Sequence, residues 1–199
     1  MLEIFHSPRS RSMRVVWLAE EMGLPYELRT ETFGQPSADF LAAGRTGAFP
    51  AIRDGDIAMG ESVAIMHYLT EVHGPTPLAL KPGHRRYAEY VQFLVFGEAS
   101  MAAFLNPVLG TQFFAPEAER QNVTVDIAKR SFTNRLKAVE AQLDKADHVA
   151  GDFTAADISV GYALGLGAMV GLSESYSPKI GAYRERLESR PAYQAAASK

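Results

Sequence analysis

A ten-residue segment, GPTPLALKPG at residues 74–83, constrains the fold of this chain more than any other feature. It holds three prolines and two glycines, which break the helix and strand patterns on either side of it. Segments of this composition commonly connect domains. We therefore predict a first domain over residues 1–75, a linker over residues 76–84 and a second domain over residues 85–199.

Strand and helix patterns alternate before the linker. The run LEIFH is typical of a strand, and a helix is predicted from about Arg11 to Met22, because Gly23 and Pro25 are helix-ending residues. A second strand, YELRT, and a short helix near residues 38–43 follow. The first two strands are expected to be parallel, because a strand-helix-strand crossover in one sheet joins parallel neighbours.

The rest of the first domain predicts a hairpin and a helix. Asp54-Gly55-Asp56 lies between two short apolar runs, and Asp-Gly in this setting is a strong hairpin signal. A third helix is predicted from about Glu61, with Ile65 and Leu69 on its apolar face. The expected fold is an α/β domain of order β-α-β-α-β-β-α with a mixed four-stranded sheet.

No strand pattern follows the linker, so the second domain is expected to be all-α. Residues 84–114 and 116–146 predict long helices that Pro107 and Pro116 interrupt or bound, and shorter helices follow. Within DFTAADI, Thr154 can cap a helix while Asp157 reaches back to the Thr154 amide. This pattern favours a structural role for Asp157 over a catalytic one.

The composition excludes several kinds of chemistry. The chain has no cysteine, so it can form neither a disulfide nor a thiolate metal site, and it has no thiol nucleophile of its own. Sulfur chemistry would need a thiol carried by a ligand, and no metal is expected. The 20 basic and 23 acidic residues are mixed along the chain, which argues against nucleic acid as a partner.

The sequence also predicts no contact with a membrane. Charged residues interrupt the N-terminal segment, which is not typical of a secretory signal. The apolar run at residues 158–172 is shorter than the roughly 20 residues needed to cross a bilayer, and we interpret it as a buried helix. A cytoplasmic location is therefore expected.

Hydroxyl and guanidinium groups gather where the first strand meets the first helix. The segment FHSPRSRSMRV holds three serines and three arginines, at positions Ser7, Ser10, Ser12, Arg9, Arg11 and Arg14. Donors and positive charge at a helix N-terminus suit an anion. The alternative is that Ser10 or Ser12 caps the helix, and that the arginines are solvated with Arg14 paired to Glu20 or Glu21.

Three stretches resemble the cytosolic glutathione S-transferase family, in its bacterial type with a serine-like active-site turn. They are FHSPRSRSMRVVWLAEEMGLPYE, GAFPAI and GESVAIMHYL, and the later FTAADIS and RPAY are similar to family features as well. The resemblance implies a thioredoxin-like, glutathione-binding N-terminal domain, an all-helical second domain and a homodimer. It also implies a transferase with a role in detoxification.

The resemblance implies how glutathione binds. Glu61 and Ser62 would hold the γ-glutamyl end, at the start of a helix where unpaired N–H groups favour an anion. Pro50 would follow a cis peptide bond, and the backbone of Phe49 would pair with the cysteinyl part of the ligand. The alternatives are that Glu61 or Ser62 is only a helix cap and that Pro50 is an ordinary trans proline.

The turn would then hold the glutathione thiol as thiolate. A thiol with a pKa near 8.5 is only about 3% ionised at pH 7, although the thiolate is the nucleophile. Ser10 is the first candidate donor, Ser12 the second and Ser7 the third, and Arg11 can share the electrostatic role. Ala48 stands where the family often has a basic residue, so the glycyl carboxylate would need another partner, either Arg45 or His6.

We expect a glutathione transferase that acts on a small hydrophobic electrophile. Glutathione-dependent isomerisation, or peroxide reduction with a second glutathione, is a possible side activity. A mixed disulfide with the protein is excluded by the missing cysteine. The alternative function is a non-catalytic scaffold or interaction protein of the same fold. The presence of all three of Glu61, Ser62 and Pro50 favours glutathione binding.

Overall fold

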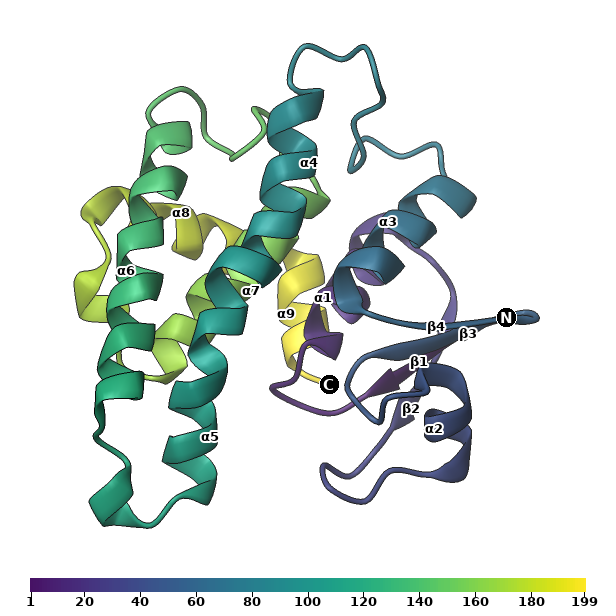
Figure 1. Cartoon of the computed structure of the whole chain (residues 1–199). Coiled ribbons are helices and arrows are strands. Elements are labelled where there is room, and N and C mark those ends of the chain that lie inside the picture. Colours follow the sequence, from purple (N-terminus) through teal and green to yellow (C-terminus); the bar gives the residue numbers. More distant parts are fainter. The chain divides into compact units, whose positions relative to one another are not determined.

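The computed structural model describes all 199 residues. Contacts between residues divide the chain into two compact units, whose helices and strands are labelled in Figure 1. The first unit contains residues 1–79 together with residues 188–199, and the second contains residues 80–187.

The first unit is built on a four-stranded mixed sheet in the order β2-β1-β3-β4. The strands are β1 (Leu2–His6), β2 (Tyr26–Thr30), β3 (Ala51–Asp54) and β4 (Ile57–Gly60). β1 is parallel to β2, and β3 is antiparallel to both β1 and β4. Gly55, at φ +60°, and Asp56 connect β3 to β4. The predicted element order, parallel pair and hairpin are confirmed.

Helices cover both faces of this sheet. Figure 1 shows α1 (Ser12–Met22) and α3 (Ser62–Val72) over one face and α2 (Ala38–Gly44) beside the other. The side chains that α1 and α3 bury include Val15, Val16, Trp17, Leu18, Ile65, Met66 and Leu69. On the second face, Phe40 of α2 packs with Phe5 of β1 and Ala51 of β3. Two apolar layers thus fix the strand ends that carry the candidate site.

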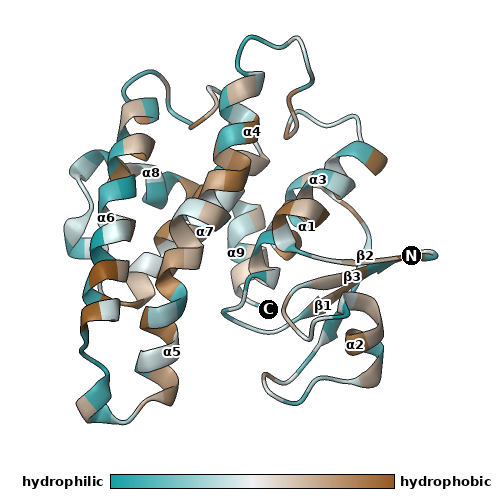
Figure 2. Ribbon diagram, viewed as in Figure 1, coloured by the Kyte–Doolittle hydropathy of each residue, from teal (hydrophilic) through white to brown (hydrophobic).

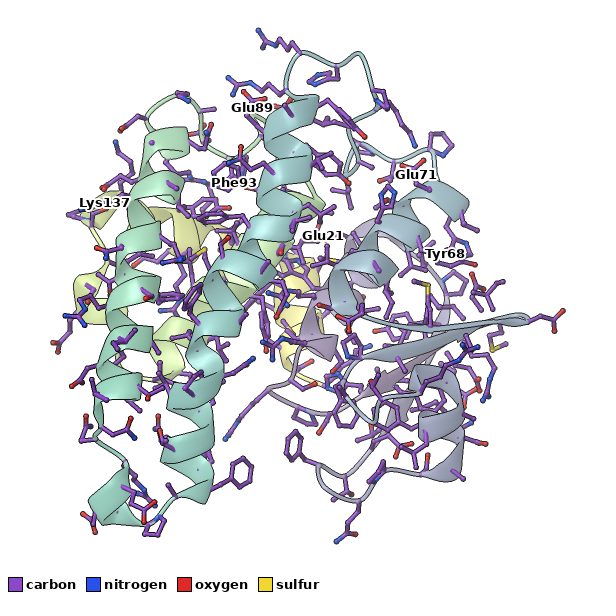
Figure 3. All side chains as sticks on the ribbon, viewed as in Figure 1. Glu21, Tyr68, Glu71, Glu89, Phe93 and Lys137 are labelled. Carbon is purple, nitrogen blue, oxygen red and sulfur yellow. The ribbon has the colours of Figure 1, made fainter.

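The C-terminal helix α9 (Pro191–Ala197) packs against α1 within the first unit. The rings of Trp17 and Tyr193 meet edge to face with centroids 4.9 Å apart. Arg190 donates two hydrogen bonds, of 2.5 and 2.8 Å, to the carboxylate of Glu21, which is labelled in Figure 3. The predicted ranges grouped residues 188–199 with the helical domain. The structure differs there because these contacts, which join residues far apart in the sequence, attach the last helix to α1.

The second unit is helical. Its long helices are α4 (Tyr87–Phe96), α5 (Asn106–Phe114), α6 (Val123–Leu143), α7 (Ala155–Met169) and α8 (Pro178–Glu188). Four short turns complete it, namely the π-helical η1 (Gly97–Met101) and the 3-10 turns η2 (Ala102–Leu105), η3 (Glu117–Glu119) and η4 (Ser173–Ser175). Figure 2 shows hydrophobic residues along α4 and α7, which pack together. The expected all-helical character is confirmed.

The chain makes a close approach to α7 directly after α4. A Cβ added at Gly97 would overlap the backbone of Ser159 on α7. Only glycine allows the two segments to approach this closely, and the chain passes through η1 and η2 before α5 begins. The sequence predicted a helix interrupted near Pro107, and Pro107 does lie in the first turn of α5.

The run Tyr87–Phe114 is long and apolar enough to cross a membrane, judged by length and composition alone. A core helix of a soluble protein has the same properties, and α4 buries Tyr90, Phe93 and Leu94 within the second unit. The shorter apolar run at residues 158–172 forms most of α7, in which eleven residues are buried, as predicted.

Candidate functional site

The topology of the sheet brings three sequence motifs to one edge. β1 ends at His6, β3 begins at Ala51 opposite Phe5, and β4 ends at Gly60 opposite Ala51. Because β3 is antiparallel to both of its neighbours, its start lies beside the ends of β1 and β4. The serine-rich turn after β1, Phe49-Pro50 before β3 and Glu61-Ser62 after β4 therefore share this edge of the first unit.

The two leading candidate serines are in direct contact. The Oγ atoms of Ser10 and Ser12 are 2.7 Å apart, and the Ser12 N–H donates to Ser10 Oγ at 3.3 Å. Ser12 is fully buried at the first position of α1, whereas Ser10 is partly exposed. The structure thus brings together a buried hydroxyl and an accessible one at a helix N-terminus.

The buried hydroxyl continues inward to a histidine. Ser12 Oγ lies 2.9 Å from His6 Nδ1 and accepts a hydrogen bond from the Ser7 N–H at 3.2 Å. His6 is 1% exposed, and its Nε2 makes no hydrogen bond in the chain. Three side chains, Ser10, Ser12 and His6, form one hydrogen-bonded row from the surface of the turn to the end of β1.

Burial lowers the pKa of His6 below its usual value. The backbone of Lys199 partly offsets this effect because it favours the charged ring, and the positive charge of Lys199 adds to the lowering. The imidazole is therefore held in its neutral form near pH 7, in which one ring nitrogen is a donor and the other an acceptor.

The arginines of the turn have separate positions. Arg9 is exposed, with a backbone φ of +64° that non-glycine residues seldom adopt. Arg11 occupies the N-cap position of α1 and is partly exposed. Arg14 is completely buried, and its Nη1 donates to Ser62 Oγ at 3.2 Å. A buried guanidinium therefore connects the first helix to the first residue of α3.

Glu61 precedes α3 in an uncommon backbone conformation. Its φ is +67° and its ψ is +102°, although it is not a glycine. Its side chain is exposed and makes no capping hydrogen bond to the helix. Strained backbone at such a position is often associated with ligand binding. The carboxylate of Glu61 is thus accessible next to the N-terminus of α3, where Ser62 is almost fully buried.

Phe49 and Pro50 are joined by a cis peptide bond, as the resemblance implies. Pro50 is buried, and the ring of Phe49 stacks on that of Phe40 with centroids 4.4 Å apart. The backbone of Phe49 makes no hydrogen bond to the rest of the chain. Its N–H and C=O groups are therefore free to pair with an extended ligand.

Arg45, a candidate for the glycyl carboxylate, and Ser7, the third candidate for the thiolate, differ in accessibility. Arg45 is exposed at the C-terminal end of α2, whereas Ser7 is buried under the turn. Sequence reasoning did not anticipate the contacts of His6 with Ser12 or of Arg14 with Ser62. Both side chains are polar and buried, and nothing near them in the sequence indicates which side chains they contact.

Comparisons with known proteins show the family of this chain. The family described as "Glutathione S-transferase, N-terminal domain" matches residues 4–77. The probable glutathione S-transferase GSTF2 of Oryza sativa subsp. japonica is 31% identical, with 93% of this chain and 90% of that protein covered. The chain belongs to the glutathione S-transferase family. Another family member, glutathione S-transferase 3 of Schizosaccharomyces pombe, is 29% identical over all of this chain and 88% of its own length.

Solved structures of the family extend over both units. The glutathione transferase of Methylococcus capsulatus str. Bath has a TM-score of 0.85 at 26% identity, covering 100% of this chain and 98% of that one. The sphingomonad glutathione S-transferase, a complex with glutathione, has a TM-score of 0.83 at 27% identity and covers 98% and 97%. The family fold, a thioredoxin-like domain followed by a helical one, is thereby established for this chain.

Proposed function

We propose that the protein binds glutathione at this sheet edge and activates its thiol as a thiolate, which attacks a small hydrophobic electrophile. The observation that carries the proposal is the convergence of the Ser10–Ser12 hydroxyl pair with the Arg14–Ser62–Glu61 group at one edge of the sheet. Membership of the family supports the choice of glutathione, and the sphingomonad relative is a complex with that tripeptide.

The γ-glutamyl end of glutathione fits the start of α3. Its α-carboxylate can accept hydrogen bonds from the free N–H groups there, where the helix dipole also favours an anion. Ser62 Oγ already accepts from Arg14, so the hydroxyl hydrogen of Ser62 is available to the ligand. The exposed carboxylate of Glu61 can pair with the ligand ammonium.

The remainder of the tripeptide extends along the edge toward the turn. The unpaired backbone of Phe49 can hydrogen-bond to the cysteinyl residue, in the manner of an added strand. Arg45 is exposed and available to the glycyl carboxylate, whereas His6 is buried under the turn. We therefore assign the glycyl carboxylate to Arg45.

Ser10 is the residue that we assign to the thiolate. It is the accessible member of the hydroxyl pair, and Ser12 behind it can donate to Ser10 Oγ. A hydrogen bond to a charged acceptor contributes about 1.5 to 3 kcal/mol, which corresponds to a shift of about one to two pKa units. Arg11 at the N-cap and the helix dipole act in the same direction. The bound thiol would then be at least about half ionised at pH 7.

Calorimetric titration with reduced glutathione in two buffers of different ionisation enthalpy tests this function. We expect saturable binding with release of a substantial fraction of a proton at pH 7, because the captured thiol loses its proton. Titration with S-methylglutathione is the control, since it should bind without release. Absence of saturable heat in both buffers would contradict the proposal and favour the scaffold alternative.

Replacing Ser10 by alanine is expected to lower kcat/KM for conjugation by about tenfold or more, and to raise the pKa of the bound thiol by about one unit. The rate is measured with an aromatic halide electrophile, and the pKa from the ultraviolet absorbance of the thiolate. Ser175→Ala, which removes an exposed hydroxyl in η4, is the control. An unchanged rate and thiol pKa in Ser10→Ala would transfer the role to Ser12 or Arg11.

The same proposal includes a cytoplasmic homodimer with a role in detoxification, because these properties accompany the resemblance. Isomerisation or peroxide reduction at the same thiolate is proposed as a side activity. Light scattering at the mass of a single chain would contradict the dimer.

A further inference from the structure

The row of side chains behind Ser10 ends at a pocket in the first unit. The pocket, of about 280 Å³, is lined by His6, Pro8, Arg9, Met13 and residues 196–199. His6 contacts Ser12 through Nδ1, and the ring is 1% exposed. Its second nitrogen, Nε2, makes no hydrogen bond of good geometry, and the backbone of Lys199, which lines the pocket, interacts with the ring. A buried histidine therefore lies between a row of hydroxyl groups on one side and a pocket on the other, with a poorly satisfied nitrogen, which is unfavourable in a buried polar group.

We propose that His6, which acts through Ser10 and Ser12, takes up the proton of the glutathione thiol and passes it to water in this pocket. The inference rests on the proposed binding of glutathione at the turn. Its geometric basis is the unbroken row of short contacts, 2.7 Å from Ser10 Oγ to Ser12 Oγ and 2.9 Å from Ser12 Oγ to His6 Nδ1.

The row works by reversing the direction of its hydrogen bonds. Before ionisation the thiol donates to Ser10 Oγ, Ser10 donates to Ser12 Oγ, and Ser12 donates to the unprotonated Nδ1 of His6. When the S–H bond breaks, Ser10 takes the thiol proton and passes its own hydrogen to Ser12. Ser12 in turn passes its own hydrogen to Nδ1. Each hydroxyl gains one O–H bond and loses one, so the only net change is a thiolate and an imidazolium.

The imidazolium then loses the proton on Nε2 to a water molecule in the pocket, which leaves a neutral ring with its hydrogen on Nδ1. In this state His6 donates to Ser12, Ser12 to Ser10, and Ser10 to the thiolate. The row therefore points toward the negative sulfur without further rearrangement. Burial lowers the pKa of His6, although the backbone of Lys199 opposes part of this effect, and the lowered pKa favours this second release.

The charged groups around His6 Nε2 are consistent with release of the proton from this nitrogen to water. Arg9 and Lys199 are the residues with charged side chains among those that line the pocket. Both are cationic, and the ammonium of Lys199 pairs with Glu20 at 3.0 Å. Glu31 also contacts His6, but this contact is a hydrogen bond between backbones: the Glu31 N–H donates to the His6 carbonyl at 2.8 Å. No carboxylate side chain lines the pocket to retain the proton, which can pass to solvent.

Replacing His6 by asparagine separates proton transfer from simple positioning. The asparagine amide can occupy the place of Nδ1 and hydrogen-bond to Ser12, but it cannot take up a proton. On rapid mixing with glutathione, we expect thiolate absorbance to appear at least about tenfold more slowly than in the wild type, with the Kd for S-methylglutathione unchanged. Added imidazole, which can enter the enlarged pocket, should restore the rate.

Two further variants complete the experiment. His67→Asn makes the same change at an exposed histidine of α3 and should leave the rate unaltered. Ser12→Ala breaks the row between Ser10 and His6, so it should slow thiolate formation without rescue by imidazole. It also provides the test if His6→Asn does not fold.

The outcomes distinguish this inference from the function on which it rests. A wild-type protein that binds glutathione without proton release contradicts the proposed function itself. Wild-type proton release together with normal rates in His6→Asn and Ser12→Ala overturns the relay alone. Slow thiolate formation in His6→Asn without rescue by imidazole also overturns the relay, because it would show that His6 only supports the shape of the turn.

Discussion

Replacing Arg14 by alanine is expected to lower the free energy of unfolding by about 3 kcal/mol and to weaken glutathione binding at least about fivefold. Arg14 is completely buried between α1 and the start of α3. Its truncation would leave a cavity and deprive Ser62 Oγ of its donor. The free Ser62 hydroxyl could then direct its hydrogen elsewhere than to the ligand carboxylate.

A second substitution separates the packing of Arg14 from its hydrogen bond. Arg14→Met retains most of the side-chain volume but has no N–H donor, so we expect most of the stability to return while glutathione affinity stays low. Urea unfolding followed by the fluorescence of Trp17 reports the first unit, because this tryptophan is the only one in the chain and is buried there. Calorimetry gives the affinity.

Arg130→Ala is the matched control, since Arg130 is exposed on α6 and should change neither quantity. If Arg14→Met bound glutathione as tightly as the wild type, the contact between Arg14 and Ser62 would have no part in ligand binding. The proposed orientation of the Ser62 hydroxyl would then be wrong.

Much of the fold could be predicted from local patterns of the sequence. Gly23 ends α1 with a φ of +62°, and Gly55 lies in the turn between β3 and β4 with a φ of +60°. In each case the pattern describes a few adjacent residues whose backbone conformation depends mainly on one another. The same holds for the capping box of Thr154 and Asp157, which the structure confirms.

Contacts between distant residues could not be predicted in this way. The sequence offered Glu20 and Glu21 as partners for Arg14 because they lie on the same helix, yet its contact with Ser62 spans 48 positions. Glu21 pairs with Arg190, which is 169 positions away. The candidate serines were identified from their place at a strand-to-helix turn, whereas the burial of His6 behind them depends on how the whole first unit packs.

The close packing at Gly97, directly after α4, could not be predicted for the same reason. A glycine in a long apolar run is compatible with a continuous helix, and nothing near Gly97 in the sequence indicates which segment approaches it. In the structure, the backbone of Ser159 occupies the space that a side chain would need. At Gly167 of α7, by contrast, the neighbours are the side chains of Phe132 and Tyr176.

Replacing Asp157 by alanine is expected to cause the largest loss of stability in the second unit, about 4 kcal/mol or more. The carboxylate is completely buried. It accepts hydrogen bonds from the Val149 N–H at 3.0 Å, the Thr154 N–H at 2.9 Å and the Tyr183 hydroxyl at 2.7 Å. Alanine would leave all three donors buried without an acceptor, and each such donor costs about 1 to 3 kcal/mol.

The hydroxyl of Tyr183 is a hydrogen-bond donor to this carboxylate that does not ionise readily. Burial of the tyrosine and the neighbouring negative charge of Asp157 raise the pKa of Tyr183 well above its usual value. The hydroxyl therefore remains a donor at any pH at which the protein is handled. Asp157 in this way joins the loop before α7, the first turn of α7 and the middle of α8 into one polar group inside an apolar core.

Urea unfolding followed by circular dichroism at the helical minimum measures the effect. Asp157→Asn keeps the shape but places an NH2 group against donors, so we expect a smaller loss, of about 2 kcal/mol. Asp126→Ala is the matched control, because Asp126 is also an acidic residue in the first turn of a helix but is exposed, and it should cost at most about 1 kcal/mol. If Asp157→Ala and Asp126→Ala were equally stable, the buried hydrogen bonds would contribute no more than a helix-dipole interaction. The stability of the second unit would then come from apolar packing alone.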